Sequence, residues 1–414
     1  MKTVSSIHKV YQAGQWLSVT NMNSHPKLGK ALSTCQCEPW VRAALILVQE
    51  RFVSGSPTNS VWSKYVSSLP STLPLSPLLW SEENLKQIKG TQMLESTLAY
   101  KAFFTSKFEE LQQTLFTRNS DVFALSAFTL ENFIWGAVMV RSRVHGPLEG
   151  ESLALVPLAD AVLHSRKANV MWQARSSGLF GRGKAIAVEA VRNIKQGDAL
   201  AMDYGSDRLD NELLLDYGVL DSANSRAGYS LNLEMSSASA LGNVDDKLDI
   251  LELNGMSGSA TFKITPDAQP GANMLGFLRL MQLKGADTFL LESVFRNEVW
   301  GHLTQPVAED NEKAICTSMI EGAQAALSGY PTSIAQDREL LSNGNLVKGS
   351  VEEAALLVRL GEKEALESLL FFFEQRLTEV STIEYYQERR LKRLGLMDDR
   401  GNTTYNSFFE KGIA

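Results

Sequence analysis

Cysteine is scarce in this chain of 414 residues, and its scarcity argues against two kinds of structural support. The three cysteines, Cys35, Cys37 and Cys316, make no disulfide framework. Cys35 and Cys37 also lack a further cysteine or histidine pair at the spacing of zinc ligands. We therefore expect ordinary loop cysteines and no metal site.

Long apolar runs are also missing. The longest of them, such as residues 133–140, fall far short of the roughly 18 apolar residues that a membrane-spanning helix needs. Residues 1–15 have neither the apolar core of a signal peptide nor the arginine content of a transit peptide. The formal net charge of −7 disfavours nucleic acid as a partner. We expect no membrane or nucleic-acid partner. Residues 1–15 do not indicate a cellular compartment.

The length and the 44% apolar content predict a globular chain of two or three domains. Residues 38–144 read as mostly helical, from a helix that begins at Pro39 to one that Thr129 caps. Strand patterns follow at 184–191, 199–203 and 229–235. The remaining part reads as helical, with helices expected at 245–253, 273–283, 287–297, 311–327 and 352–394.

Three short motifs stand between residues 153 and 218. An apolar run at 153–158 passes into PLADAVLH at 157–164, ALAMDY follows at 199–204, and DNELLLDYG stands at 210–218. Two strand-like runs thus end on polar or aromatic residues, and a short helix follows. This arrangement favours a pocket over a uniform core.

These motifs resemble the catalytic half of the SET-domain methyltransferases of the plant Rubisco large-subunit lysine methyltransferase family, which includes the chloroplast aldolase methyltransferases. The two motif tyrosines, Tyr204 and Tyr217, have the family's spacing, whereas Leu163 stands where the family has Asn. The resemblance implies an α+β fold, in which a SET-domain β-fold with a helical insertion precedes an all-α substrate-binding domain. The implied domains are a remnant of the N-terminal SET segment (1–37), the insertion (38–144), the catalytic core (145–240) and the substrate-binding domain (241–414).

The resemblance also implies roles for single residues. Tyr204 matches the tyrosine that orients the amine at the point of methyl transfer, and we take it as the catalytic residue. His145 and Met202 would line the lysine channel with it. The residues implied to bind S-adenosylmethionine are Ser142, Arg143, Asp160, Leu163, His164 and Tyr217.

Each of these residues also has a structural reading. Tyr204 and Tyr217 could be core tyrosines, and Arg143 could be a solvated helix end. His164 reads more readily as a packed, hydrogen-bonded histidine than as a base, and Asp160 more readily as a residue that ties down its loop. Trp172 lies near a family aromatic that stacks on adenine.

The family opens its SET domain with a Gly-x-Gly turn around the methionine end of the cofactor, whereas residues 1–28 contain only Gly14. Either part of the pocket is missing or the sequence is shortened. The interpretation is a protein-lysine N-methyltransferase that uses S-adenosylmethionine, acts by resemblance on the Rubisco large subunit or on fructose-bisphosphate aldolase, and is monomeric. Two alternatives stay open: a degenerate SET scaffold that binds a protein partner, and a protein-histidine methyltransferase. The resemblance implies the chloroplast stroma, with the cytoplasm as the alternative.

Overall fold

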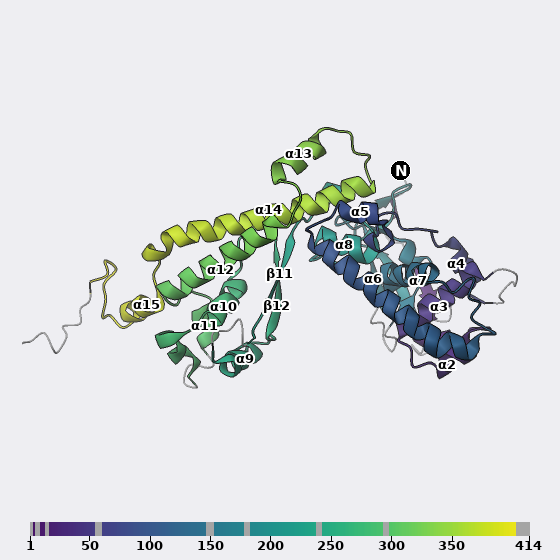
Figure 1. The fold of residues 1–414 in the computed structure, drawn as a ribbon, viewed down its shortest axis with the longest axis horizontal. Coiled ribbons are helices and arrows are strands. Elements are labelled where there is room, and N and C mark those ends of the chain that lie inside the picture. Colours follow the sequence, from purple (N-terminus) through teal and green to yellow (C-terminus); the bar gives the residue numbers. More distant parts are fainter. Residues whose placement is uncertain are drawn as a thin grey trace, which may run out of the picture. The chain divides into compact units, whose positions relative to one another are not determined.

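The chain divides into two compact units in the computed structural model, which describes residues 3–4, 9–12, 16–53, 60–145, 153–177, 183–236, 242–292 and 298–402. The first unit comprises residues 1–226 and 338–358, and the second comprises residues 227–337 and 359–414. Figure 1 shows the order of their elements along the chain. The fold is α+β, as predicted.

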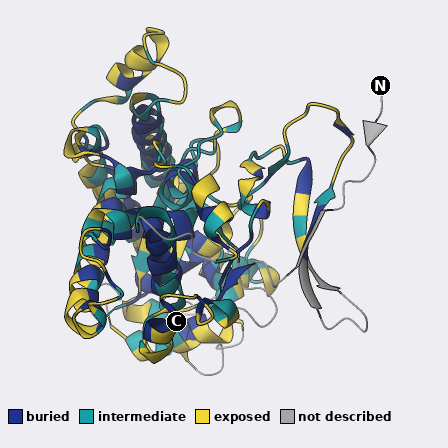
Figure 2. Cartoon of the chain, turned by 90° about the vertical axis from the view of Figure 1, so that its right-hand side faces the viewer, coloured by how far each residue is buried: buried dark blue, intermediate teal, exposed yellow. Residues whose placement is uncertain are grey.

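Helices form most of the first unit. They are α1 (Val19–Met22), α2 (Gly29–Thr34), α3 (Pro39–Phe52), α4 (Ser63–Ser68), α5 (Glu82–Lys86), α6 (Gln92–Leu111), α7 (Leu130–Arg143) and α8 (Asp210–Tyr217). Their buried apolar residues form the largest core, which Figure 2 shows in dark blue. As predicted, the Thr129 hydroxyl caps α7 by accepting a hydrogen bond from the Asn132 N–H (3.2 Å).

Helices α3 and α7 cross closely because a glycine stands at their contact. A Cβ atom placed on Gly136 would lie 2.8 Å from the Ala44 carbonyl oxygen, so only a residue without a side chain fits there. The crossing fixes the C-terminal end of α7, which continues directly into a strand at Val144.

The strands of the first unit form several small sheets, one of which includes the strand that follows α7. Strand β5 (Ala154–Leu155) pairs with both β3 (Leu17–Ser18) and β4 (Val144–His145). Strand β8 (Gly183–Ala190) lies between β2 (Lys9–Gln12) and β7 (Val170–Ser177). The remaining pairs are β1 (Thr3–Val4) with β9 (Ile194–Lys195) and β6 (Leu163–His164) with β10 (Ala201–Met202).

The β6–β10 pair is parallel, with Leu163 opposite Ala201 and His164 opposite Met202. The Leu163 N–H donates to the Leu200 carbonyl (3.2 Å), and the Ser165 N–H donates to the Met202 carbonyl (3.0 Å). This register joins the first two predicted motifs, and Tyr204 follows two residues after β10.

The second unit combines one antiparallel strand pair with helices. Strand β11 (Tyr229–Glu234) is confirmed as predicted, but its partner β12 (Ser259–Ile264) adds a strand to the segment for which only helices were expected. The helices that lie wholly in this unit are α9 (Val244–Leu253), α10 (Ala272–Met281), α11 (Val299–Leu303), α12 (Glu309–Ser328) and α15 (Tyr386–Arg393). Helices α13 (Ile334–Ser342) and α14 (Val351–Glu379) contain residues of both units.

The predicted single helix over 352–394 is wrong. Helix α14 ends at Glu379, a 3₁₀ turn covers Val380–Thr382, and α15 begins at Tyr386. Gly395 ends α15 with φ of 68°, as expected for a helix-terminating glycine. The expected helix at 287–297 is a 3₁₀ segment over Gly285–Leu291, and 293–297 lie outside the described residues.

Two buried ionic clusters hold the second unit together. Glu312 on α12 pairs with Arg279 on α10 (2.5 Å) and with Arg376 on α14 (2.5 Å). Asp337 on α13 pairs with Arg359 (2.7 Å) and Lys363 (2.6 Å) on α14. Each buried carboxylate is thus matched by two cations, which offsets the cost of removing it from water.

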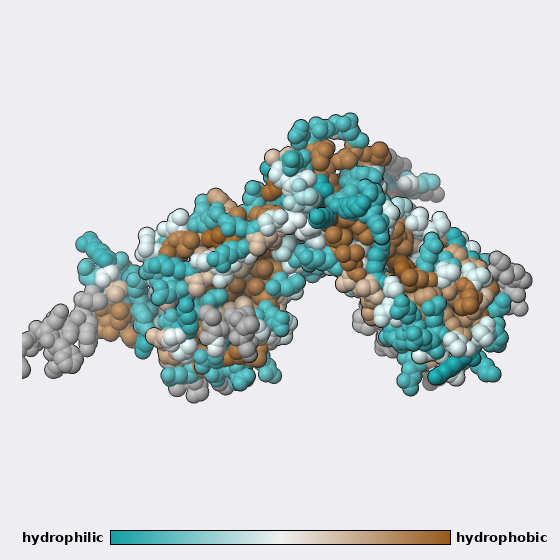
Figure 3. All heavy atoms as spheres, viewed as in Figure 1, coloured by the Kyte–Doolittle hydropathy of each residue, from teal (hydrophilic) through white to brown (hydrophobic). Residues whose placement is uncertain are grey.

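Two further expectations concern the surface and the cysteines. No described helix is long and apolar enough to cross a membrane. On the face of the molecule that Figure 3 shows, apolar residues are interspersed with hydrophilic ones. Cys35 and Cys37 form a disulfide between α2 and α3, so the expectation of ordinary loop cysteines is wrong. No cluster of potential metal ligands is found within the described residues.

Candidate active site

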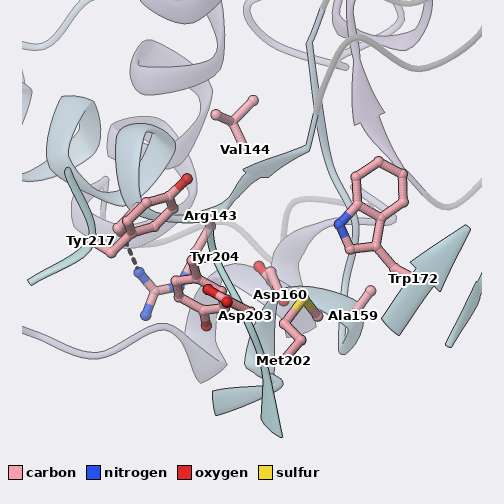
Figure 4. A pocket seen from close by; sticks show the side chains of 10 residues that line it. Arg143, Val144, Ala159, Asp160, Trp172, Met202, Asp203, Tyr204 and Tyr217 are labelled. Carbon is pink, nitrogen blue, oxygen red and sulfur yellow. Dashed lines mark hydrogen bonds between the residues drawn. The ribbon is translucent and has the colours of Figure 1, made fainter. Parts of the chain in front are cut away.

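A cavity of about 230 Å³ opens in the first unit where α7 ends, and we call it the tyrosine cavity. Figure 4 shows Tyr217 and Trp172 at opposite sides of this group of side chains, with Tyr204, Asp160 and Met202 between them. Its lining residues come from α7, β4, β7, β10, α8 and the short loops beside them. They are Ser142, Arg143, Val144, Ala159, Asp160, Trp172, Met202, Asp203, Tyr204 and Tyr217.

Arg143 is the cation of the tyrosine cavity, and it is the last residue of α7. Its Nη1 donates a hydrogen bond to the Ser142 hydroxyl oxygen (2.7 Å), and the Ser142 hydroxyl donates to the Val138 carbonyl (2.8 Å). The side chain is therefore oriented from within its own helix. A guanidinium has five N–H donors, so donors remain for an anionic group.

Tyr204 is held from both ends. Its hydroxyl donates a hydrogen bond to the Val162 carbonyl (2.5 Å), and its backbone N–H donates to Nδ1 of His164 (3.3 Å). Its ring packs against those of Tyr217 (4.8 Å between centroids) and His164 (5.1 Å). Burial raises the pKa of Tyr204 to about 12, so the phenol stays protonated at neutral pH.

Asp160 and Tyr65 form a hydrogen bond that the sequence did not indicate. The Tyr65 hydroxyl donates to Oδ2 of Asp160 across 95 positions of the chain. Burial raises the pKa of Asp160 to about 6, although the Tyr65 hydrogen bond and the nearby Arg143 both act to lower it. Burial also raises the pKa of the Tyr65 phenol. Asp160 is therefore a carboxyl whose charge changes near neutral pH.

Tyr217 is fixed by a second charged group at the end of α8. Arg141 and Arg208 both form ion pairs with Asp216, and the Arg208 guanidinium lies over the Tyr217 ring (5.3 Å to the centroid). The helix ends at Gly218, which has φ of 64°. The third sequence motif thus supplies the aromatic ring of Tyr217 and the Asp216 carboxylate, whereas the two arginines that pair with this carboxylate lie outside the motif.

The structure brings most of the predicted site residues together. Six of them line the tyrosine cavity: Ser142, Arg143, Asp160, Met202, Tyr204 and Tyr217. His145 belongs to β4, but its side chain lies outside the described residues.

Two predicted cofactor-binding residues, Leu163 and His164, lie in β6 and are not among the residues that line the cavity. Leu163 is 59% exposed, and its backbone N–H is already paired with Leu200. Burial lowers the pKa of His164, and its Nε2 has no hydrogen-bond partner within the described residues. Neither residue therefore contributes to the cavity wall through its side chain.

Four lining residues stood outside the predicted set: Val144, Ala159, Trp172 and Asp203. Val144, Ala159 and Asp203 adjoin predicted residues, so adjacency to Arg143, Asp160 and Tyr204 could have indicated them. Trp172 lies on β7, and its resemblance to a family aromatic was the one signal for it.

The chemistry of this cavity is that of binding and orientation. It presents one guanidinium, two phenols, an indole and two carboxyls, and burial raises the pKa of one of these carboxyls, Asp160, to about 6. Its volume lies below the roughly 300–1,000 Å³ of most small-molecule sites. A narrow site with aromatic walls suits a slender aliphatic chain, and the guanidinium suits a carboxylate.

Comparison with known proteins supports the family resemblance that the sequence motifs predict. The Rubisco LSMT substrate-binding family matches residues 242–366. The chain is 37% identical over 371 residues to the chloroplastic [fructose-bisphosphate aldolase]-lysine N-methyltransferase of Arabidopsis thaliana, covering 89% of this chain and 75% of that protein. It is 36% identical over 372 residues to the chloroplastic Rubisco large-subunit N-methyltransferase of Nicotiana tabacum, covering 89% and 74%.

A solved structure is similar over nearly the whole chain. It is the crystal structure of the SET domain of LSMT bound to lysine and AdoHcy, with a TM-score of 0.81 and 35% sequence identity. The match covers 97% of this chain and 89% of that one. The predicted SET-domain fold is confirmed by this likeness.

Proposed function

Because the chain belongs to the family of SET-domain Rubisco and aldolase lysine methyltransferases, we propose that it transfers a methyl group from S-adenosylmethionine to a lysine side chain of a protein. The tyrosine cavity is the site of transfer. The observation that carries this proposal is the Tyr204 hydroxyl, fixed on the Val162 carbonyl beside Arg143 in a narrow aromatic cavity.

The residues of the cavity fit S-adenosylmethionine, whose sulfonium supplies an electrophilic methyl group. Arg143, oriented by Ser142, has donors for the carboxylate of the methionine end. Tyr217, held by Arg208 and Asp216, presents an aromatic face on the same wall. Asp160 and Asp203 complete the polar part of the lining.

Methyl transfer to an amine requires that the amine be neutral and correctly aligned. A phenol that remains protonated can accept a hydrogen bond from the amine while it donates to Val162, and this fixes the direction of the amine lone pair. Burial and the positive charge of Arg143 both disfavour an ammonium in the cavity. Met202 and the Trp172 ring supply apolar walls for the aliphatic part of a lysine.

The acceptor proteins that we propose are the Rubisco large subunit and fructose-bisphosphate aldolase, in the chloroplast stroma. Both come from the names of the relatives, which act on these proteins and are chloroplastic. Purified chain should be incubated with S-adenosylmethionine and each candidate separately, and the products mapped by mass spectrometry. A methylated lysine on either protein supports the proposal, whereas a methylated histidine supports the alternative acceptor.

The competing proposal is a scaffold that binds a protein without transferring a methyl group. Calorimetry with S-adenosylmethionine separates the two, because a scaffold would show no cofactor binding. The oriented guanidinium and the fixed phenol favour the enzyme, since protein binding alone requires neither of them in a shared cavity.

We further propose that residues 241–414 recognise the protein substrate, while residues 38–144 and 145–240 form the insertion and the catalytic core, with 1–37 as the N-terminal SET segment. The match of the substrate-binding family to residues 242–366 supports this division. Removal of residues 241–414 should abolish methylation of a folded protein; because it also removes residues 338–358 of the first unit, cofactor binding by the shortened chain has to be measured beside it. Full activity of the shortened chain on the folded protein would contradict the division.

A further inference from the structure

A second cavity of about 300 Å³ lies within the second unit, between α11 and α15, and we call it the arginine cavity. Figure 1 shows these two short helices side by side. The cavity combines one buried tyrosine with a group of basic side chains. Its lining residues are Glu298, Gly301, His302, Gln305, Tyr386, Arg389, Arg390 and Arg393.

Helix α15 is anchored firmly enough to give this cavity a fixed wall. The Tyr386 N–H donates to the Val307 carbonyl (3.2 Å), and Nη2 of Arg389 donates to the Pro306 carbonyl (2.7 Å). The buried Tyr386 ring packs edge-on against His302 of α11, with 5.1 Å between ring centroids. The wall is thus held by hydrogen bonds and by a buried aromatic contact.

The basic residues of α15 share one helix face. Arg389, Arg390 and Arg393 follow Tyr386 at three, four and seven positions, which places them on the side that faces α11. Arg389 is partly used, because it donates to two backbone carbonyls. Arg390 and Arg393 are exposed, and no ion pair involves either of them within the described residues.

The neighbouring Lys392 behaves differently, although it belongs to the same helix. It pairs with Glu384 (2.7 Å) and does not line the cavity. Among the described residues that line the arginine cavity, Glu298 is the one carboxylate that faces three guanidinium groups. The cavity therefore has an excess of positive charge that this part of the chain does not neutralise.

The pKa of His302 is consistent with an excess of positive charge in the arginine cavity. Burial lowers the pKa of His302, and Arg393 and Arg389 lower it further, while Glu298 acts in the opposite direction. The imidazole is accordingly neutral at pH 7 and can donate or accept a hydrogen bond. The chain as a whole carries a formal charge of −7, so a cationic cavity does not follow from its composition.

We propose that the arginine cavity binds carboxylate side chains of an acidic segment of the protein substrate. Guanidinium groups bind carboxylates through two parallel hydrogen bonds, and those of Arg390 and Arg393 form no ion pair within the described part of the chain. The match of the substrate-binding family includes α11, whereas α15 lies beyond its end at residue 366. As a docking site for the substrate, the cavity rests on the proposed methyl transfer.

The first test measures binding without methyl transfer. A fluorescent oligo-glutamate peptide is titrated with the full chain at low salt, and its anisotropy is followed. The double variant Arg390→Gln/Arg393→Gln should bind it about tenfold more weakly, as expected for the loss of two exposed charge contacts. A charge-matched control, Lys392→Gln/Arg400→Gln, removes the same charge outside the cavity lining and should stay within about twofold.

The second test uses the folded protein substrate. The cavity variant should raise KM about tenfold with kcat unchanged, because a docking contact made outside the tyrosine cavity contributes to binding alone. S-adenosylmethionine binding should match that of the parent chain. If no methylation is detected with any variant, the proposed function fails, and the peptide titration still decides whether the cavity binds carboxylates.

Three results would overturn the docking proposal. One is equal peptide affinity of the parent chain and the cavity variant. Another is an equal loss in the charge-matched control, which would indicate bulk charge. The third is a single-stranded oligonucleotide of the same charge that binds more tightly than the peptide and loses more affinity in the cavity variant.

Discussion

Asp160 in the first unit and Asp337 in the second are both aspartates whose burial acts to raise the pKa, but their hydrogen-bond partners differ in charge. Burial raises the pKa of Asp160 to about 6, and its side-chain donor is the neutral hydroxyl of Tyr65. Burial acts to raise the pKa of Asp337 too, but the hydrogen bonds from Arg359 and Lys363 outweigh it and lower the pKa. The first carboxyl can gain a proton near neutral pH, and the second stays ionised.

The contrast extends to the surroundings of each residue. In the second unit, the buried carboxylates of Glu312 and Asp337 are each paired with two cations, which suits residues that hold helices together. In the first unit, by contrast, polar groups of the described residues are incompletely matched, including the Arg143 guanidinium in the tyrosine cavity and the Nε2 of His164, whose ring packs against Tyr204. Incomplete matching costs stability and is expected where a ligand completes the set.

The largest effect should follow from breaking a matched cluster. Glu312→Gln leaves Arg279 and Arg376 without their carboxylate, in a site where the Glu312 side chain is 1% exposed. We expect a loss of about 3–5 kcal/mol in unfolding free energy, measured by calorimetry. The control Glu309→Gln breaks the exposed pair with Lys313 and should cost far less, because water screens exposed ion pairs. Equal losses would mean that the buried cluster does not hold the unit together.

Replacement of the fixed phenol should affect rate rather than folding. Tyr204→Phe removes the hydroxyl that donates to Val162, and we expect methyl transfer to fall about hundredfold while cofactor affinity changes little. Steady-state kinetics and calorimetry measure the two quantities. Tyr100→Phe, whose ring lies under Arg141 outside the tyrosine cavity, should retain nearly the parental rate. Parallel losses of rate and affinity would assign Tyr204 a structural role.

The raised pKa of Asp160 predicts a dependence of stability on pH. Between about pH 4 and 6 the folded chain holds a proton that the unfolded chain has lost, so Asp160 makes the fold less stable as pH rises through this window. Asp160→Asn removes this penalty and can still accept the Tyr65 hydrogen bond. Its stability relative to the parent should therefore rise between pH 4 and 7, by at most about 3 kcal/mol.

Chemical denaturation at several pH values measures this change. The exposed Asp198, replaced by Asn, serves as the control and should show no comparable gain. A relative stability of Asp160→Asn that stays constant or falls with rising pH would contradict the contrast with Asp337.

The smallest effect is expected at the exposed position 163. Leu163→Asn introduces the amide that family members carry there, and one added hydrogen bond should raise affinity for S-adenosylmethionine by at most about tenfold. Leu163→Ala controls for removal of the leucine itself. Calorimetry in which both variants gain equally would show that the amide makes no contact with the cofactor.

Short sequence motifs predicted several of the residues that line the tyrosine cavity. Arg143, Tyr204 and Tyr217 each belong to a contiguous motif, so the resemblance could place them without knowledge of long-range contacts. The hydrogen bond between Tyr65 and Asp160 spans 95 positions and has no local pattern. The sequence did not predict the end of α14 at Glu379. The apolar spacing typical of a helix continues past this residue, but the chain forms a 3₁₀ turn over Val380–Thr382.

The parallel pair β6–β10 determines which sequence changes the chain can tolerate. Successive residues of a strand are about 3.3 Å apart and point to opposite faces, so a slip of one residue would displace Tyr204 by that distance and reverse Met202. Insertions or deletions within residues 199–203 should thus be rare among homologues of this chain. Length changes that leave the register at Ala201 and Met202 intact should be common, so variation in length can accumulate without moving the tyrosine.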